Sequence, residues 1–232
     1  MDYITIPGSS TLNLESGDFT IRWRARYQSH TNTYNMFLSW ISGGNYVQIM
    51  YKGVDAKYRL ITNTWTEGSG QAIDSGLLTP TDNIWYYIVL VRSGNTFSWY
   101  INNALSNSVV RTGALTDTSA ITLKIGADDT AGREFHGWID ELEIIKGTAI
   151  TDFSIPTSEL QRQANTSLLL NFYGQDGQKA ADDSSVNSHA LTFVNNAQID
   201  TAQYVYGGSS AAFNVSDFTN STFAAHRFFN IT

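Results

Sequence analysis

The sequence predicts an all-β fold, an antiparallel sandwich of two sheets, from three observations. First, residues 83–103 (NIWYYIVLVRSGNTFSWYINN) contain two apolar runs separated by a break at residues 93–95. Phe97, Trp99 and Ile101 alternate with polar residues in the second run, and a Gly-Asn break between two such runs is a strong hairpin signal. Second, this alternation recurs along the chain. Third, no stretch has a convincing helical period.

The composition indicates a folded chain that carries few charges. Apolar residues make up 42% and aromatic residues 13%, so the chain can bury a sizeable core and is not disordered. Only 15% of the residues are charged, which is common in extracellular β proteins and virion parts. Cysteine is absent, which excludes disulfides, thiolate metal sites and a cysteine nucleophile. A length of 232 residues suits one domain or two, and β-sandwiches often use it for one.

The charge pattern narrows the class of partner. A net charge of −7 argues against nucleic acid or an anionic membrane as the partner. No run approaches the roughly 20 apolar residues of a membrane-spanning helix, so we expect no membrane insertion. The first residues, MDYITIPGSS, lack the basic head and apolar segment of a signal peptide. We therefore expect export by another route, or a mature or virion-assembled product.

The first two strands are predicted from the alternation of apolar and polar residues. Tyr3–Ile6 is predicted as a short strand, and Asp18–Arg26 as a half-buried antiparallel strand. In the second of these, apolar side chains alternate with Arg22, Arg24 and Arg26. We expect this row of arginines to form a solvated sheet face, since such faces are ordinarily charged.

The next elements are a hairpin, a strand and a Gly-rich loop. Tyr34–Ile41 and Tyr46–Tyr51 are predicted strands joined by a Gly-Gly turn, and Lys57–Thr62 follows. Residues 63–76 (NTWTEGSGQAIDSG) form a polar loop that leads to the central hairpin. Ala120–Ile125 is a further strand.

Residues 135–145 (FHGWIDELEII) form a long strand with an irregular pattern. Ile139 falls on one parity, whereas Leu142 and Ile144 fall on the other. A strict ladder would bury a carboxylate. We therefore expect a β-bulge near Asp140-Glu141 that resets the register.

Residues 151–160 are predicted as an extended exit segment, because Pro156 favours an extended conformation in the residue before it. After this segment, the alternating pattern of β-strands starts again in the last part of the chain. The tail, residues 215–232, has several phenylalanines and no clear period, and we expect it either to dock on a neighbouring molecule or to cover its own sheet. The strands predicted in this part are Leu168–Phe172, His189–Val194, Ala197–Ile199 and Ser210–Phe213.

Several phrases together resemble the laminin-G-like branch of the concanavalin-A-like jelly rolls. In their order, these are Asp2–Pro7 as the first strand, Gly17–Ile21 with Trp23 as the second, Trp85–Ile101 as the central hairpin and Gly137–Leu142 as the closing strand. The variant is similar to domains of bacteriophage tail and virion proteins, whose exit often reads like Gly147–Ala149 through Phe153 and Pro156. The resemblance implies a jelly-roll β-sandwich.

Residues 166–214 resemble the opening of such a domain, but they follow the closing strand. The phrases are Leu168–Phe172, Asp183–Ser185 with Asn187 and His189, Asn196–Gln198, and Gly207–Ala211. Either a second domain is cut short, or one domain is written in circularly permuted order. We favour permutation, because residues 1–160 alone would expose a sheet edge and a fragment of residues 161–214 would be marginal. The fragment could also complete a neighbouring subunit instead.

The sequence predicts no catalytic residue. The family that the sequence resembles includes jelly-roll β-glucanases, which carry the motif Glu-x-Asp-x-x-Glu on one strand. The nearest match is residues 138–143, where Trp138 occupies the position of the first carboxylate. The four histidines are widely separated and form no short-spaced zinc motif.

We expect no required cofactor, and calcium is the ion that the sequence favours. Related folds hold calcium in loops rich in oxygen donors, and we expect Asp140 and Asp183 as the first candidates. The alternative is turn chemistry, because Asp and Asn fold back on their own backbone. The other loop donors are Asp128, Asp129, Asp182 and Asn187.

A glycan site needs an exposed aromatic ring beside hydrogen-bonding groups. Trp65 lies in the polar loop and is the first candidate platform, followed by Tyr34 and Tyr46. A loop tryptophan that caps the core is an equally good interpretation. Trp23 and Trp99 lie on apolar parities and are expected in the core, as is Trp85.

Taken together, these features favour a non-catalytic virion structural or adhesion module, from a phage tail, fibre or capsid surface. Its expected partners are other virion proteins or copies of itself, with a cell-surface glycan as a further partner. The alternative is a carbohydrate-binding module of a secreted, extracellular enzyme. A glycoside hydrolase is the least favoured function.

Overall fold

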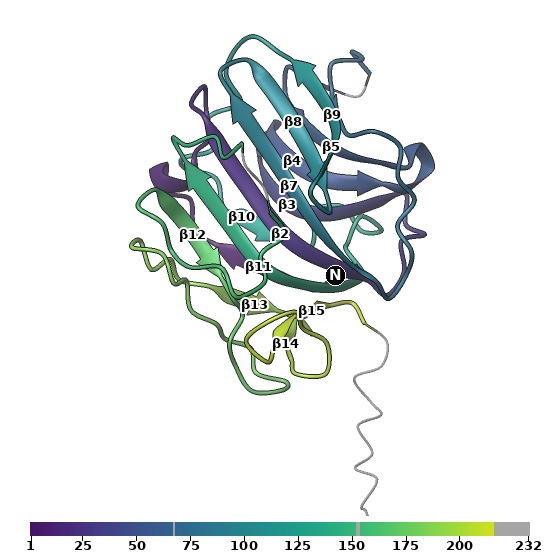
Figure 1. Cartoon of the computed structure of the whole chain (residues 1–232), viewed down its shortest axis with the longest axis vertical. Helices are drawn as coiled ribbons and strands as arrows, with labels where there is room; N and C mark the ends of the chain where they lie inside the picture. Colours follow the sequence, from purple (N-terminus) through teal and green to yellow (C-terminus); the bar gives the residue numbers. More distant parts are fainter. Residues whose placement is uncertain (67, 152–153, 216–232) are drawn as a thin grey trace, which may run out of the picture.

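Two antiparallel sheets face each other across one hydrophobic core (Figure 1). The computed structural model describes residues 1–66, 68–151 and 154–215. Within these ranges the regular elements are β-strands and two short 3₁₀ turns, η1 (Ser10–Leu12) and η2 (Gly53–Asp55), with no α-helix. The predicted all-β sandwich is confirmed.

The seven-stranded sheet contains the first strand of the chain and the hairpin predicted from Tyr34–Ile41 and Tyr46–Tyr51. Its strand order is β13 (Thr192–Val194), β1 (Tyr3–Ile6), β10 (Leu123–Ile125), β3 (Tyr34–Ser42), β4 (Asn45–Lys52), β5 (Lys57–Thr62) and β6 (Ile73–Asp74).

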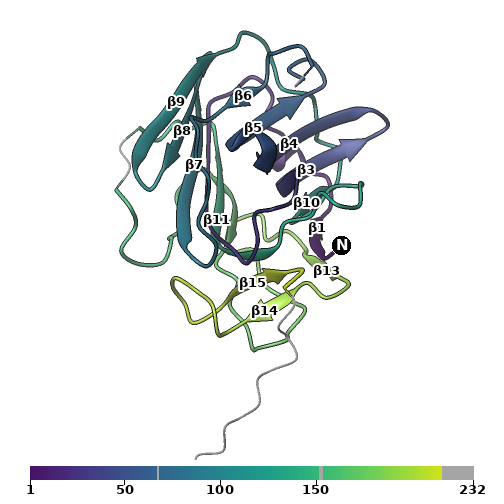
Figure 2. The same ribbon diagram turned by 90° about the vertical axis from the view of Figure 1, so that its right-hand side faces the viewer.

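The eight-stranded sheet contains the central hairpin, and Figure 2 shows the two layers side by side. β12 (Thr166–Leu170) pairs with β11 outside the main path. The order along that path is β14 (Gln198–Asp200), β15 (Ser210–Phe213), β11 (Gly137–Lys146), β2 (Phe19–Tyr27), β7 (Trp85–Ser93), β8 (Thr96–Ile101) and β9 (Ala104–Val110).

The core between the sheets is rich in aromatic rings. Trp23 packs against Phe37 and Trp99, with ring centroids 5.2 and 6.4 Å apart. The hydroxyl of Tyr27 donates to that of Tyr58 at 3.2 Å, so these two buried hydroxyl groups satisfy each other. Burial raises the pKa of both phenols, because the charged form would lose its hydration.

The predicted β-bulge in β11 is confirmed. Asp140 lies opposite Arg24 of β2 and Glu143 lies opposite Arg22, so β11 uses one more residue than β2 between these pairs. Glu141 is the extra residue and has a φ of 52°. The bulge therefore lets Ile139 and Leu142 both face the core.

The arginine row on β2 is not a solvated face, so that prediction was wrong. The exit segment crosses this outer face, where Ala149 and Ile150 pack against Tyr87 and its neighbours on β7. Arg24 is 8% exposed and donates to the carbonyl oxygen of Pro156 at 2.8 Å. Arg22 forms an ion pair with the buried Glu143, whose Oε2 lies 2.6 Å from both Nε and Nη2 of the arginine.

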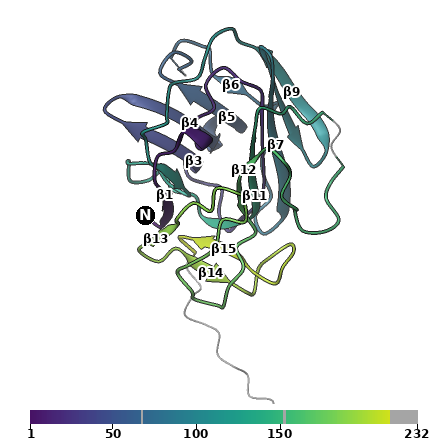
Figure 3. The same ribbon diagram turned by 90° about the vertical axis from the view of Figure 1, so that its left-hand side faces the viewer.

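Strands β12–β15 come from the last part of the chain and pair with strands of the first part. β13 pairs with β1, while β12 and β15 share one edge of β11 on either side of its bulge. The main-chain nitrogen of Asp2 donates to Asn214 Oδ1 at 3.0 Å. Figure 3 shows this end of the sandwich, with β13–β15 beside the N-terminus. The prediction for Phe218, Phe223, Phe228 and Phe229 falls on residues 216–232, outside the described residues.

Candidate functional site

A pocket of about 350 Å³ opens on the outer face of the seven-stranded sheet, over β3, β4 and β5. Side chains on a strand alternate between its two faces, so every second residue of these strands points away from the core. The pocket is lined by Tyr34, Tyr46, Gln48, Met50, Ile61 and Arg133, with Thr66 and Gly68 at its rim. We call it the tyrosine pocket.

The floor of the tyrosine pocket is a small apolar cluster outside the main core. Met36 and Met50 lie opposite each other in the β3–β4 ladder, and Ile61 joins them from β5. Both methionines are buried, and Tyr34 and Tyr46 pack against them from the sides as half-buried rings. In the β3–β4 ladder Tyr34 lies opposite Lys52 and Tyr46 lies opposite Ile41, so the two tyrosines stand toward opposite ends of this apolar floor.

The polar side of the pocket is organised by Asp128, which is 1% exposed. Its carboxylate accepts a hydrogen bond from Gln48 Nε2 at 3.0 Å and one from the amide of Thr130 at 2.6 Å. Arg133 lies 3.5 Å from the same carboxylate, and its guanidinium stands 4.6 Å from the ring centroid of Tyr34. These contacts hold an amide and a cation beside the two rings.

Such an arrangement suits a hydroxyl-rich ligand. An aromatic ring can pack on the C–H face of a sugar, while amide and guanidinium groups bond its hydroxyl oxygens. Tyr34 and Tyr46, two of the predicted glycan residues, are thus brought into one pocket. Arg133, Gln48 and Met50 were not predicted; the only signal in the sequence was the outward parity of Gln48 and Met50 beside Tyr46.

Trp65 is in a different environment from the one expected of a platform. Its side chain is 5% exposed, belongs to the main core and stands edge-on to Phe97 with ring centroids 5.5 Å apart. The structure thus corrects the first glycan candidate, because a buried ring offers no open face. Its loop still contributes Thr66 and Gly68 to the rim of the tyrosine pocket.

Asp140 is fully buried and is held by main-chain donors. Its Oδ1 accepts from the amide of Glu141 at 2.9 Å, and its Oδ2 accepts from the amides of Val205 and Tyr206 at 2.8 and 3.3 Å. Burial raises the pKa of Asp140 to about 7, and this effect outweighs the amide donors, which favour the charged form. The carboxylate thus connects the bulge of β11 to the β14–β15 loop.

Asp183 lies elsewhere, in the loop after β12. Its carboxylate accepts from the amides of Leu169, Ser185 and His189 at 2.9–3.0 Å and lies 2.7 Å from Nδ1 of His189. Burial works to raise the pKa of Asp183, but these donors together hold it below its ordinary value. Nε2 of His189 in turn contacts the hydroxyl of Thr11 at 2.9 Å. This series of contacts ties the C-terminal strands to η1.

The structure does not bring Asp140 and Asp183 together, and both are engaged by protein donors. Across residues 1–66, 68–151 and 154–215, no group of three or more acidic or histidine side chains is placed to hold a metal ion. Calcium binding at either aspartate stays a prediction. Glu143, the acid nearest to a glucanase motif, is fully buried and paired with Arg22.

Among the described residues, no helix has both the length and the apolar character needed to cross a membrane.

The solved structures that share this fold include two that cover most of the sandwich. One is a protein from Bacteroides ovatus with a proposed carbohydrate-binding role, at a TM-score of 0.60 and 14% identity over 84% of this chain; the chain spans 56% of that protein's length. The other is domain 4 of an extracellular GH43 arabinanase from Geobacillus stearothermophilus, solved with arabinotriose. Its TM-score is 0.51 and its identity 18%, over 64% of this chain and 68% of that domain.

A search of curated protein sequences gave no match. Residues 1–155 match the family model described as the concanavalin A-like lectin/glucanases superfamily, of the laminin-G type. The matched segment contains β1–β11, including the whole tyrosine pocket. This chain therefore belongs to the concanavalin A-like lectin/glucanases superfamily.

Proposed function

We propose that this chain is a non-catalytic carbohydrate-binding module and that the tyrosine pocket is its sugar site. The observation that carries the proposal is one pocket in which Tyr34 and Tyr46 stand at the sides of an apolar floor and Asp128 holds Gln48 and Arg133. The carbohydrate-binding role proposed for the Bacteroides ovatus protein and the arabinotriose bound to the arabinanase domain support the same function here. The arabinanase is extracellular, which supports an extracellular location.

The test is glycan binding by the full chain and by two variants, Tyr34→Ala and Tyr46→Ala. Screening on a glycan array followed by calorimetry should identify a sugar whose affinity falls about tenfold or more in each variant, because an aromatic contact contributes roughly 1–2 kcal/mol. Tyr204→Ala is the matched control, since Tyr204 is exposed in the β14–β15 loop and outside the pocket.

Equal affinity of the wild type and both tyrosine variants for a bound glycan would place the sugar elsewhere and reject this site. A chain that binds no glycan and forms a closed oligomer in solution would instead favour the virion adhesion role. That role rests on the resemblance of the exit segment to virion domains and is our second proposal.

A calcium requirement is a separate question. Calorimetric titration with calcium chloride would show it directly, and Asp183→Asn should abolish the heat if Asp183 is a ligand. Binding of calcium with unchanged affinity in that variant would exclude Asp183.

A further inference from the structure

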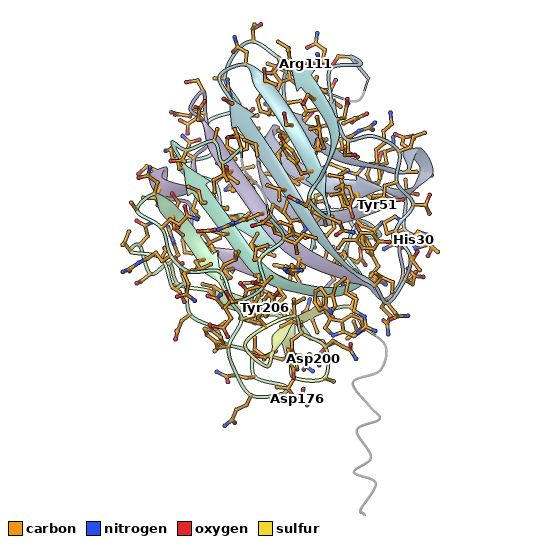
Figure 4. All side chains as sticks on the ribbon, viewed as in Figure 1. His30, Tyr51, Arg111, Asp176, Asp200 and Tyr206 are labelled. Atoms are coloured by element: carbon orange, nitrogen blue, oxygen red, sulfur yellow. The ribbon has the colours of Figure 1, made fainter. Side chains whose placement is uncertain are left out.

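A second pocket, of about 360 Å³, lies on the outer face of the other sheet. It sits where the end of β2, the start of β7, the start of β11 and the loop after β14 meet. Figure 4 labels Asp200 at this lower end of the molecule. The pocket is lined by Arg26, Gln28, Asn83, Trp138, Asp200 and Gln203, and we call it the arginine pocket.

Arg26 differs from the other two arginines of β2 in having open donor capacity. Arg22 is paired with Glu143, and Arg24 donates to Pro156. Arg26 has only a long hydrogen bond, 3.4 Å, from Nη2 to Asn83 Oδ1, and its buried Nε has no acceptor among the described residues. Within the described chain no carboxylate lies within 4.0 Å of its guanidinium.

The guanidinium is held in place by an aromatic ring. It stands 5.2 Å from the ring centroid of Trp138, which is 7% exposed and packs with Ala212, Val215 and Trp85. Burial lowers the pKa of Arg26 from its ordinary value, while the charge of Asp200 works in the opposite direction. A half-buried cation without a close counter-ion gains from an anionic ligand.

Asp200 does not supply that counter-ion, because its oxygens are engaged elsewhere. Oδ2 accepts from Trp138 Nε1 at 2.9 Å, and Oδ1 accepts from the amides of Ala202 and Gln203 at 2.6 and 3.2 Å. The carboxylate therefore fixes the tryptophan and shapes the loop. Its charge nevertheless disfavours a dianion in the same pocket, so phosphate and sulfate fit less well than a carboxylate with one charge.

The remaining lining groups are amides. Asn83 is exposed, and the side chains of Gln28 and Gln203 are half-buried around the opening. Amides recognise hydroxyl groups, and planar guanidinium recognises a carboxylate with two parallel hydrogen bonds. The volume lies within the range of small-ligand pockets.

We infer that the arginine pocket binds an acidic sugar, with the uronate carboxylate on Arg26 and the sugar hydroxyls on the surrounding amides. This site is on the opposite face from the tyrosine pocket and does not depend on the function proposed for that pocket.

Calorimetry of the full chain with D-glucuronate, D-galacturonate, D-glucose and acetate tests the inference. At least one uronate should bind ten times or more tighter than glucose and acetate, and raising the salt concentration should weaken it. Arg26→Gln should reduce uronate affinity at least tenfold. Arg162→Gln removes the same charge from an exposed position and should leave the affinity unchanged.

Gln203→Ala provides a second variant, because it removes the side-chain amide while the main-chain bond to Asp200 remains. It should weaken uronate binding severalfold without loss of the cooperative unfolding transition. Acetate that binds as well as the uronates would overturn the inference, since the pocket would then recognise no sugar. Uronate affinity unchanged in both Arg26→Gln and Gln203→Ala would overturn it as well.

Discussion

Gly137, the first residue of β11, has a φ of 150°, and a Cβ built on it would lie 2.0 Å from the carbonyl oxygen of Arg26. Gly137→Ala should therefore lower the free energy of unfolding by about 3 kcal/mol, from strain and a backbone shift. Gly147→Ala is the matched control: Gly147 has a φ of 78° with open space around it, so only a conformational cost of about 1 kcal/mol is expected. Urea unfolding measures both, and equal losses would show that the clash is relieved without cost.

The environments of individual side chains were the feature least well predicted from the sequence. Trp65 is surrounded by polar residues in sequence, but whether a loop side chain folds inward depends on what lies beneath it, here Phe97 from a distant strand. The environment of Arg24 is set by Pro156 and Tyr206, far along the chain. Arg133 joins Tyr34 in the same way, through tertiary structure alone.

At the scale of elements, local pattern predicted most strands but missed β6 and β9, and β9 is an exposed edge strand without alternating burial. The β7–β8 hairpin follows from alternation and the Gly-Asn turn, and its register places Leu90 opposite Trp99. The bulge in β11 follows from a change of parity between Ile139 and Leu142, because each strand must keep its apolar residues on the core face. Patterns of this kind lie within a few neighbouring residues, so they need no knowledge of distant partners.

The same bulge should make stability depend on pH. Asp140 has a pKa raised by burial from 3.8 to about 7, so between these values the folded chain binds more protons than the unfolded chain. Its contribution to the free energy of unfolding therefore falls as the pH rises from about 4 to about 7, by at most about 4 kcal/mol. Glu141, whose pKa is also raised by burial, acts in the same direction.

Asp140→Asn should flatten this decline, and urea unfolding at pH 5 and pH 8 measures it. Asp176→Asn is the control, since Asp176 is exposed. The lowered pKa of Asp183 opposes the trend only in more acidic solution, where its stabilising contribution is lost as it takes up a proton. An identical pH dependence in wild type and Asp140→Asn would contradict the assignment.

At the scale of the whole molecule, residues 162–215 and residues 1–161 share both sheets. Without β12, β13 and β15, strands β1 and β11 would have bare edges, so a chain of residues 1–161 should aggregate or remain unfolded. Asp2 bonds to Asn214, so a short Gly-Ser linker should join Val215 to Met1 without strain.

A chain that runs from Arg162 to Val215, through that linker, and from Met1 to Gln161 should therefore fold. Circular dichroism should give the wild-type spectrum and a Tm within several degrees of that of the wild type. A soluble, cooperatively unfolding chain of residues 1–161 would contradict the shared-sheet account, because the last strands would then be dispensable.

The placement of the six tryptophans gives the molecule a built-in optical reporter. The indoles of Trp23, Trp40, Trp65 and Trp99 are in the interior, whereas Trp138 lines the arginine pocket and Trp85 packs beside it. Intrinsic fluorescence should thus respond when a ligand enters that pocket and stay nearly constant when one settles on Tyr34 and Tyr46. A titration followed by both tryptophan fluorescence and calorimetry can then show which of the two pockets a given saccharide binds.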